Sequence, residues 1–364
     1  MSWGNPTTPL EKFRKTLLTP ASAAYFIGSL MRLQGYRNGL LKREQVEIPV
    51  ISVGNITCGG TGKTPVTIDL AQRFVLAGVK VGILSRGYKR QSKDATLVVS
   101  DGAGNFANCA DSGDEPYLIA KRVPKAVVLV GSNRRASANL AVSHYNCRVL
   151  ILDDGFQHLA VHRDADLVLI DYNDEPANDS LLPAGRLREP LSALSRSTSL
   201  VITKIPDNYD SSKLERLEKF LSSYAAEQTI SKCRFTASQL VSPTCVMLQA
   251  DALNGNSIVA VSALARPEPF HKLLRERGAN LVDTLSWPDH HWYSDDDMKR
   301  IETAGERADL VVTTEKDMVK MKPSERLAEK LYALRIETEW LSSPPPAVTQ
   351  ILSTLTHSSR SVGV

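Results

Sequence analysis

The apolar residues of this chain alternate between short continuous runs and helical spacing. The run at residues 49–53 is followed by Val66, Leu70 and Phe74, which recur at i, i+4 spacing in a segment that ends near Gly78. Such alternation predicts an α/β fold with a mostly parallel sheet and helices on both faces. Buried strands are expected at residues 49–53, 79–84, 126–130, 148–152, 165–170 and 199–202.

The pattern changes near residue 228. A charged helical segment at 211–226 precedes an extended segment at 229–241. The alternation of strands and helices then restarts, with strands expected at residues 258–261, 310–313 and 331–336. We therefore predict a smaller α/β domain that is joined to the first by an extended linker, with residues 331–341 pairing along that linker.

These patterns divide the chain into an N-terminal segment at residues 1–45, a main domain at 46–228 and a smaller domain at 229–364. Residues 342–346 are rich in proline and are expected to lead out of the smaller domain. The last residues are expected to form a frayed end.

The N-terminal segment combines apolar and basic residues. Up to Gln45 it holds seven basic residues and two acidic ones, whereas the whole chain of 364 residues has a net charge of only +4. The uncharged stretch at 16–31 is too short for a helix that crosses a bilayer of roughly 30 Å. An interfacial helix that docks on an anionic membrane fits this pattern, and so does a first helix packed on the protein's own core.

Composition limits the remaining possibilities. A hydrophobic content of 42% and a charged content of 23% are typical of a folded globular protein. The five cysteines are scattered and form no CxxC pair, which argues against disulfides and zinc and favours a reducing, cytosolic environment. The basic excess is local and lacks a recognition motif, so we expect no nucleic-acid partner.

A phosphate-binding loop follows the first predicted strand. Its glycines let backbone N–H groups surround phosphate oxygens, and the next helix points its N-terminus at them. Lys63 would reach the β- and γ-phosphates, and the Thr64 hydroxyl would ligate Mg²⁺. This spacing predicts a P-loop NTPase fold of the RecA or Rossmann-like kind. The expected ATP-binding residues are Thr57, Cys58, Gly59, Gly60, Thr61, Gly62, Lys63 and Thr64.

Two acidic pairs could serve this loop. Asp153 and Asp154 follow the strand at 148–152, where a P-loop protein holds its metal. Asp114 and Glu115 follow Ser112, so they fit either a helix-capping box or a carboxylate that accepts a proton. The local sequence leaves both interpretations of Asp114 open.

Four segments together resemble one family. They are Val53-Gly-Asn-Ile-Thr-Cys-Gly-Gly-Thr-Gly-Lys-Thr-Pro65, Ser85-Arg-Gly-Tyr88, Asp153-Asp-Gly-Phe-Gln-His158 and Leu181-Leu-Pro-Ala-Gly-Arg-Leu-Arg-Glu-Pro190. The chain is similar to tetraacyldisaccharide 4′-kinases, the lipid A 4′-kinases of Gram-negative bacteria. The similarity extends to Asp289-His290 and to Thr313-Thr-Glu-Lys-Asp317.

The resemblance implies transfer of the γ-phosphoryl group of ATP to the 4′-hydroxyl of a tetraacylated glucosamine disaccharide 1-phosphate, at the cytoplasmic face of the inner membrane. It implies Lys63, Asp114 and His290 as catalytic residues, with Asp114 as the base and His290 oriented against it. Because His290 and His291 are adjacent, at most one is expected to face the site. The implied Mg²⁺ ligands are Thr64, Asp153, Asp154 and Glu115. The implied substrate residues are Tyr88, Arg134, His158 and Arg186.

Other interpretations remain open. His158 also fits a core position, and Arg186 fits a solvated loop. A membrane-associated ATPase switch of the partitioning or cell-division type shares the Gly-Gly-x-Gly-Lys-Thr loop, but such proteins carry a lysine where this chain has Cys58. A soluble small-molecule kinase would leave the basic N-terminus without a purpose.

Overall fold

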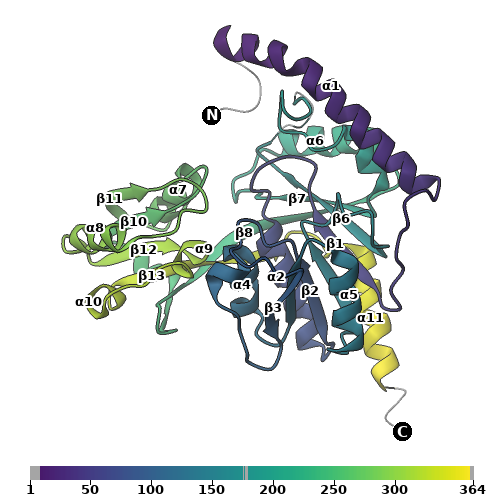
Figure 1. The fold of residues 1–364 in the computed structure, drawn as a ribbon. Coiled ribbons are helices and arrows are strands. Elements are labelled where there is room, and N and C mark those ends of the chain that lie inside the picture. The colour runs from purple at the N-terminus through teal and green to yellow at the C-terminus, as the bar shows by residue number, and fades with distance from the viewer. Residues whose placement is uncertain (1–8, 175, 177–178, 361–364) are drawn as a thin grey trace.

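The computed structural model describes residues 9–174, 176 and 179–360 (Figure 1). One mixed sheet of 13 strands runs through both halves of the molecule. Its order is β11-β10-β12-β13-β8-β7-β6-β1-β5-β2-β4-β3, with β9 beside β8. The α/β P-loop class predicted from the sequence is confirmed.

The first half of the sheet contains the six expected strands and one unexpected strand. Buried parallel strands form where the apolar runs are, because both of their faces are covered by helices. The strands are β1 (Val50–Gly54), β2 (Val81–Ser85), β3 (Thr96–Asp101), β4 (Val127–Gly131), β5 (Val149–Asp153), β6 (Ala165–Asp171) and β7 (Ser199–Thr203). The helices are α2 (Lys63–Leu76), α3 (Cys109–Ser112), α4 (Asp114–Arg122), α5 (Arg134–Ser143) and α6 (Ser211–Tyr224), with a 3-10 helix at Leu191–Arg196.

The second half restarts the same alternation on the other side of β8. Its strands are β8 (Thr229–Val241), β9 (Met247–Gln249), β10 (Ser257–Ser262), β11 (Asn280–Ser286), β12 (Leu310–Thr314) and β13 (Leu331–Trp340). Its helices are α7 (Glu268–Glu276), α8 (Asp295–Gly305), α9 (Glu315–Met318) and α10 (Glu325–Ala328), with a 3-10 helix at Ala250–Leu253.

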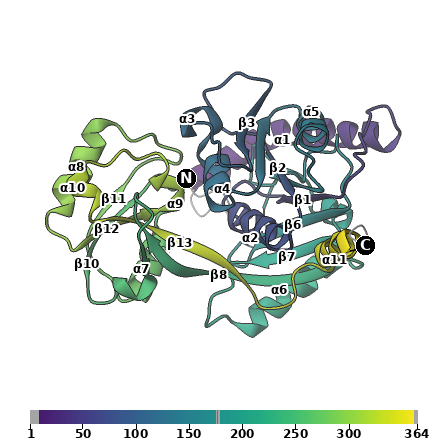
Figure 2. The same ribbon diagram turned by 90° about the horizontal axis from the view of Figure 1, so that it is seen from below.

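Strand β8 joins the two halves. Its first residues, 229–232, pair in parallel with β7, and residues 233–241 pair antiparallel with β13. The expected pairing along the linker is therefore confirmed. Figure 2 shows β8 and β13 as the long two-stranded ribbon between the halves.

The C-terminal helix α11 (Pro346–Arg360) corrects the expectation of a frayed end as far as Arg360, and the last four residues of that expectation, 361–364, lie outside the described residues. Val348 and Leu355 are buried in the same apolar cluster as Phe74 of α2. The proline-rich exit supplies the start of this helix, since proline suits a first turn, and the Pro345 carbonyl accepts from the Val348 N–H at 2.9 Å. The chain thus returns from the smaller half to pack on the larger one.

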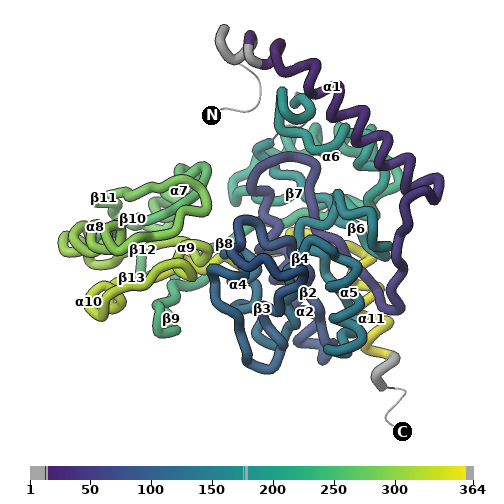
Figure 3. The backbone as a smooth tube through the Cα atoms, viewed as in Figure 1, coloured from purple at the N-terminus to yellow at the C-terminus, as the bar shows by residue number. Residues whose placement is uncertain are grey.

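Helix α1 (Pro9–Arg37) lies along one end of the larger half (Figure 3). The Ser22 hydroxyl donates to the Leu181 carbonyl at 3.0 Å, and the Tyr25 hydroxyl donates to the Arg188 carbonyl at 2.8 Å. Among the described residues, no helix combines the length and the apolar character needed to cross a bilayer.

Candidate active site

The P-loop is shaped by two glycines with positive φ. Gly59 has φ 139°, and Gly62, which caps the N-terminus of α2, has φ 83°. A Cβ on Gly62 would also overlap the Phe235 ring of β8. Only glycine fits there, because the conformation is left-handed and a second element packs against it. The loop therefore turns its backbone sharply into the start of α2, as phosphate binding requires.

Neighbouring segments hold the carbonyls of this loop. The Thr203 hydroxyl, at the end of β7, donates to the Thr61 carbonyl at 2.8 Å. The Lys204 ammonium donates to the Gly60 carbonyl and pairs with Asp171 at 2.6 Å. These bonds engage two of the loop's carbonyls on the protein side. The Cys58 and Thr61 N–H groups donate to the Arg186 and Gly59 carbonyls at 2.7 and 3.1 Å, so phosphate oxygens would be met by the other N–H groups of the loop.

Lys63 lies among polar groups where phosphates would sit. Its Nζ is 3.3 Å from Oδ1 of Asn55 and 3.5 Å from Oδ1 of Asp154. Arg188 holds the same Asp154 carboxylate through contacts of 3.0 and 2.9 Å. Burial would raise the pKa of Asp154, but Lys63 and Arg188 outweigh it and hold that pKa below its usual value.

Asp153 occupies a different environment one residue earlier. It is buried at the end of β5, and one oxygen accepts from the Ser85 hydroxyl at 3.0 Å. Burial raises the pKa of Asp153 to about 6, and the nearby charges of Glu115 and Asp154 add to this effect. Excess negative charge at the end of a P-loop sheet suits a divalent cation. Within the described parts of the chain, no group of three or more Asp, Glu, His or Cys residues is arranged to hold a metal by itself.

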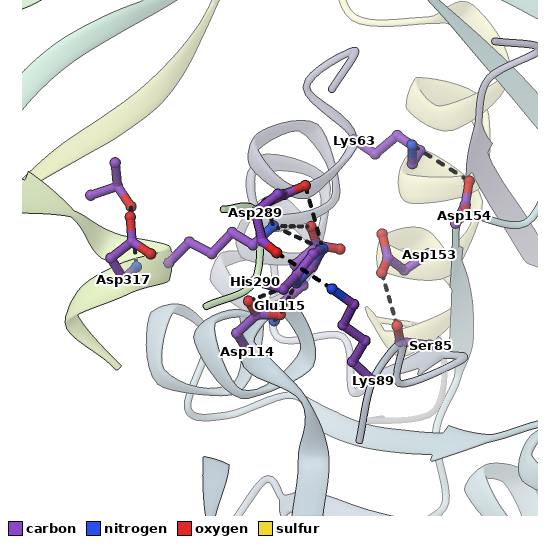
Figure 4. A network of polar contacts seen from close by, with 12 residues as sticks. Lys63, Ser85, Lys89, Asp114, Glu115, Asp153, Asp154, Asp289, His290 and Asp317 are labelled. Atoms are coloured by element: carbon purple, nitrogen blue, oxygen red, sulfur yellow. Dashed lines mark hydrogen bonds and ion pairs between the residues drawn. The ribbon is translucent and has the colours of Figure 1, made fainter. Parts of the chain in front are cut away.

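Asp114 begins α4, with Gly113 as the N-cap, so Ser112 does not form the capping box that the sequence allowed. Its carboxylate is 4% exposed and faces His290 of the smaller half (Figure 4). The His290 Nδ1 lies 2.8 and 3.1 Å from the two Asp114 oxygens. Burial opposes ionisation, but His290, Lys316 and Lys320 together hold the pKa of Asp114 below its usual value.

The two adjacent histidines have different partners. The His291 Nε2 lies 2.9 Å from the Asp297 carboxylate, and its ring stacks on Trp287 at an interplanar angle of 18°. His290 has φ 62°, a left-handed conformation that turns its side chain toward the larger half. Of the two adjacent histidines, His290 therefore faces Asp114 and His291 faces Asp297.

Helix α4 is tied to the smaller half at both ends. At its start, the buried Lys320 ammonium lies 3.6 Å from Asp114. At its end, Arg122 pairs with Glu315 at 2.6 Å and with Glu337 at 2.7 Å. These contacts span about 200 positions in the sequence, so nothing local in the sequence indicates them.

The four expected substrate residues lie in different environments. Tyr88 is 64% exposed, and its ring is 5.4 Å from that of His290. Arg134 is buried and donates to the Ser85 and Gly131 carbonyls, and burial lowers its pKa to about 10.

The remaining two are partly enclosed. Burial lowers the pKa of His158 to about 4, and the Arg134 charge contributes. Arg186 is held by Asp179 at 2.6 Å and by Asp174 at 2.8 Å. Of the four, Tyr88 alone presents its side chain openly beside the Asp114–His290 pair.

Comparison with known proteins identifies the family. The model of the tetraacyldisaccharide-1-P 4′-kinase family, LpxK, matches residues 14–356. The tetraacyldisaccharide 4′-kinase of Anaeromyxobacter sp. (strain Fw109-5) is 38% identical over 342 residues, 93% of this chain and 91% of that protein. The tetraacyldisaccharide 4′-kinase of Syntrophus aciditrophicus (strain SB) is 38% identical over 332 residues, 88% of each chain.

A solved structure agrees with this assignment. The "apo" form of LpxK from Aquifex aeolicus, crystallised in complex with ATP, matches with a TM-score of 0.77 at 32% identity. The match covers 94% of this chain and 99% of that one. By family model, by sequence identity over most of its length and by fold, this chain belongs to the tetraacyldisaccharide 4′-kinase family, the ATP-dependent lipid A 4′-kinases.

Proposed function

We propose that the ATP phosphates lie in the P-loop against Lys63 and that the 4′-hydroxyl of the disaccharide lies at Asp114. The observation that carries this proposal is the buried Asp114–His290 pair, which is built from both halves of the molecule and lies near Glu115, Asp153 and Asp154 (Figure 4). Asp114 would take the hydroxyl proton while the new O–P bond forms and the bond to the leaving ADP oxygen breaks.

Thr64, Asp153, Asp154 and Glu115 would hold Mg²⁺ together with phosphate oxygens and water, which supply the ligands that a protein cage would otherwise provide. The ion neutralises phosphate charge when it is bound. The supporting observation is Asp153, a buried carboxylate whose pKa is raised to about 6 and which has a single hydroxyl partner.

Tyr88 is proposed as a direct contact for the acceptor sugar, because it is exposed next to His290. Arg134, His158 and Arg186 are proposed to border the acceptor and phosphate region. The buried positive charge of Arg134 acts on both Asp153 and Asp154, which supports its place beside the phosphates.

The roles of the pair are tested by a double-mutant cycle. We expect His290→Ala to lower kcat for lipid phosphorylation by about 10- to 100-fold, because Asp114 loses the group that orients it. In an Asp114→Asn background, His290→Ala should add little, since residues that act as a unit are not additive. Losses that multiply in the double variant would mean that the two residues act independently.

We also propose that α1 docks the enzyme on the membrane that holds its acceptor. Phe13, Leu17, Ile27 and Met31 are exposed by 67, 68, 55 and 71%. Their spacing places them on one side of a helix with 3.6 residues per turn. Ser22, on the opposite side, is the residue that contacts the protein body. An apolar stripe that faces away from the protein, on a basic segment, supports an interfacial helix.

This docking predicts a loss of membrane binding without a loss of fold. Replacing Leu17, Ile27 and Met31 together with serine should lower binding to anionic phospholipid vesicles at least about tenfold, because three apolar side chains no longer enter the acyl region. Flotation of the purified variant with vesicles measures this directly.

A matched control replaces exposed apolar residues elsewhere, Leu76 and Met247, with serine. These residues are exposed by 86 and 54% and lie outside α1. The control should float as the wild type does. Equal flotation of the α1 variant and the wild type would show that the stripe does not contact the membrane.

A further inference from the structure

Residues 181–190, which we call the bridging segment, lie between α1 and the P-loop. On the P-loop side, the Cys58 N–H donates to the Arg186 carbonyl at 2.7 Å. The Arg188 N–H donates to the Ile56 carbonyl, also at 2.7 Å. Backbone hydrogen bonds thus join this segment to the stretch of chain that leads from β1 into the phosphate-binding glycines.

The bridging segment also reaches the acidic side of the site. Its Arg188 guanidinium lies 3.0 and 2.9 Å from the two Asp154 oxygens. The neighbouring Leu187 is only 4% exposed and packs in the same apolar cluster as Ile56 and Phe156. A displacement of this segment would therefore move the entry to the P-loop and the Asp154 carboxylate together.

Two hydroxyl groups of α1 hold the opposite side of the bridging segment. The Ser22 hydroxyl accepts from the Ala184 N–H at 3.0 Å and donates to the Leu181 carbonyl at 3.0 Å. The Tyr25 hydroxyl donates to the Arg188 carbonyl at 2.8 Å. Tyr25 thus binds the backbone of the residue whose side chain reaches the acidic side of the site.

These polar contacts are not secondary to a large apolar interface. Of the α1 residues whose burial is described, Ser22 and Gly35 alone are buried. Gly35 lies against Leu41, just beyond the helix, and its carbonyl accepts from the Leu41 N–H at 2.9 Å. The buried contact between α1 and the body of the larger half is therefore the one that Ser22 makes with the bridging segment.

We propose that Ser22 and Tyr25 are positioning residues for phosphoryl transfer, which act through the bridging segment on the P-loop and on Asp154. The inference rests on the proposed function, in which the ATP phosphates lie in the P-loop and α1 docks on the membrane. The exposed apolar stripe lies on the other side of the same helix. Membrane docking and the shape of the phosphate site therefore depend on one element.

Hydrogen exchange tests the positioning directly. Wild type and a Ser22→Ala, Tyr25→Phe double variant are compared as full-length enzymes in detergent micelles, without nucleotide. The amides of Cys58 and Arg188 should exchange at least about tenfold faster in the variant, because their acceptors lie on a connection that α1 no longer holds. Peptides from β10 in the smaller half should exchange at the wild-type rate.

Kinetics supply the second readout. The double variant should lose about tenfold in kcat/KM for ATP, because small displacements of phosphate-binding groups are costly. Its flotation with anionic vesicles should stay within about twofold of the wild type, since the apolar stripe is unchanged. Ser22→Thr, which keeps the hydroxyl, should stay within about threefold of the wild type in kcat/KM.

The matched control is Thr19→Val with Tyr36→Phe, which removes one aliphatic and one phenolic hydroxyl from the same helix. The Thr19 hydroxyl donates to the Lys15 carbonyl within α1, and the Tyr36 ring lies 5.8 Å from the Arg43 guanidinium. Neither contact involves the bridging segment. The control should match the wild type in exchange, in kinetics and in flotation.

Three results overturn the inference: unchanged exchange of the Cys58 and Arg188 amides in the double variant, a kcat/KM for ATP within twofold of the wild type, or a loss of flotation equal to the loss of rate. If the double variant fails to fold, Tyr25→Phe alone, which keeps Ser22 in place, is measured in the same way. Wild-type kinetics in Lys63→Ala would overturn the proposed function itself. An inactive Lys63→Ala beside a double variant with wild-type kinetics would overturn only the inference about α1.

Discussion

Replacing Asp114 with asparagine should lower kcat for lipid phosphorylation by about 1,000- to 10,000-fold, the contribution expected of a positioned general base. Asparagine has nearly the same shape and can still accept from His290, so the packing between the two halves should persist. It cannot take the proton of the acceptor hydroxyl. ATP binding, measured by equilibrium titration, should remain within about threefold of the wild type because Asp114 does not contact the P-loop.

The control for this variant is Asp296→Asn. The Asp296 side chain is 93% exposed at the start of α8. The Asp296→Asn variant therefore loses one negative charge, as Asp114→Asn does, but leaves the Asp114–His290 pair unchanged. If Asp114→Asn retained more than about a tenth of the wild-type kcat, Asp114 would not be the base. In that case the Asp114 carboxylate would hold the two halves together through its bond to His290.

Lys63→Ala should abolish transfer to the lipid, with a loss of about 1,000-fold or more in kcat/KM for ATP. In the proposed site the Lys63 ammonium follows the γ-phosphoryl group between its two oxygens, and water cannot replace it at a fixed position. Arg188 still pairs with Asp154 in this variant, so the local charge balance is kept in part. Steady-state kinetics with labelled ATP measure the effect.

Lys80→Ala provides the comparison, since Lys80 is an exposed lysine of the same half that lies outside the P-loop. It should retain the wild-type rate. A Lys63→Ala enzyme within tenfold of the wild type would show that phosphate recognition depends on the loop's N–H groups and not on this side chain.

The sequence predicted the strands that are buried on both faces and missed those at the edges. Parallel strands such as β5 and β7 are buried throughout, so they appear as continuous apolar runs. Strand β11 lies at one edge of the sheet with most residues exposed, and β3 is an antiparallel strand at the other edge. Their composition is mixed because water or a loop covers one face, so these strands do not appear in the sequence as continuous apolar runs.

Helix α11 was missed for a different reason. Its apolar positions 347, 348, 351, 352 and 355 have helical spacing, but they follow the proline-rich exit at residues 342–346. Prolines end helices in most contexts, whereas here Pro346 begins one. Only the fold shows that this helix packs on an apolar cluster that includes Phe74, a residue some 270 positions earlier in the sequence.

The residues of the candidate site were likewise predictable from the sequence only in part. The P-loop is local in sequence, so its glycines and Lys63 could be identified from spacing, and family resemblance pointed to Asp114 and His290. Lys316, Lys320 and Lys204 could not be identified as partners of the site, because each meets its partner only through folding. A buried ion pair between distant residues leaves no periodic pattern in the sequence.

The most direct test of the account is the stoichiometry of the reaction. Purified enzyme, γ-labelled ATP and tetraacyl disaccharide 1-phosphate are mixed in detergent micelles, and ADP and labelled lipid are measured in the same samples over time. The account predicts one labelled lipid for each ADP, with the label on the 4′-oxygen, and neither product in Lys63→Ala. ADP formed without labelled lipid would contradict it and would indicate an ATPase of the switch type.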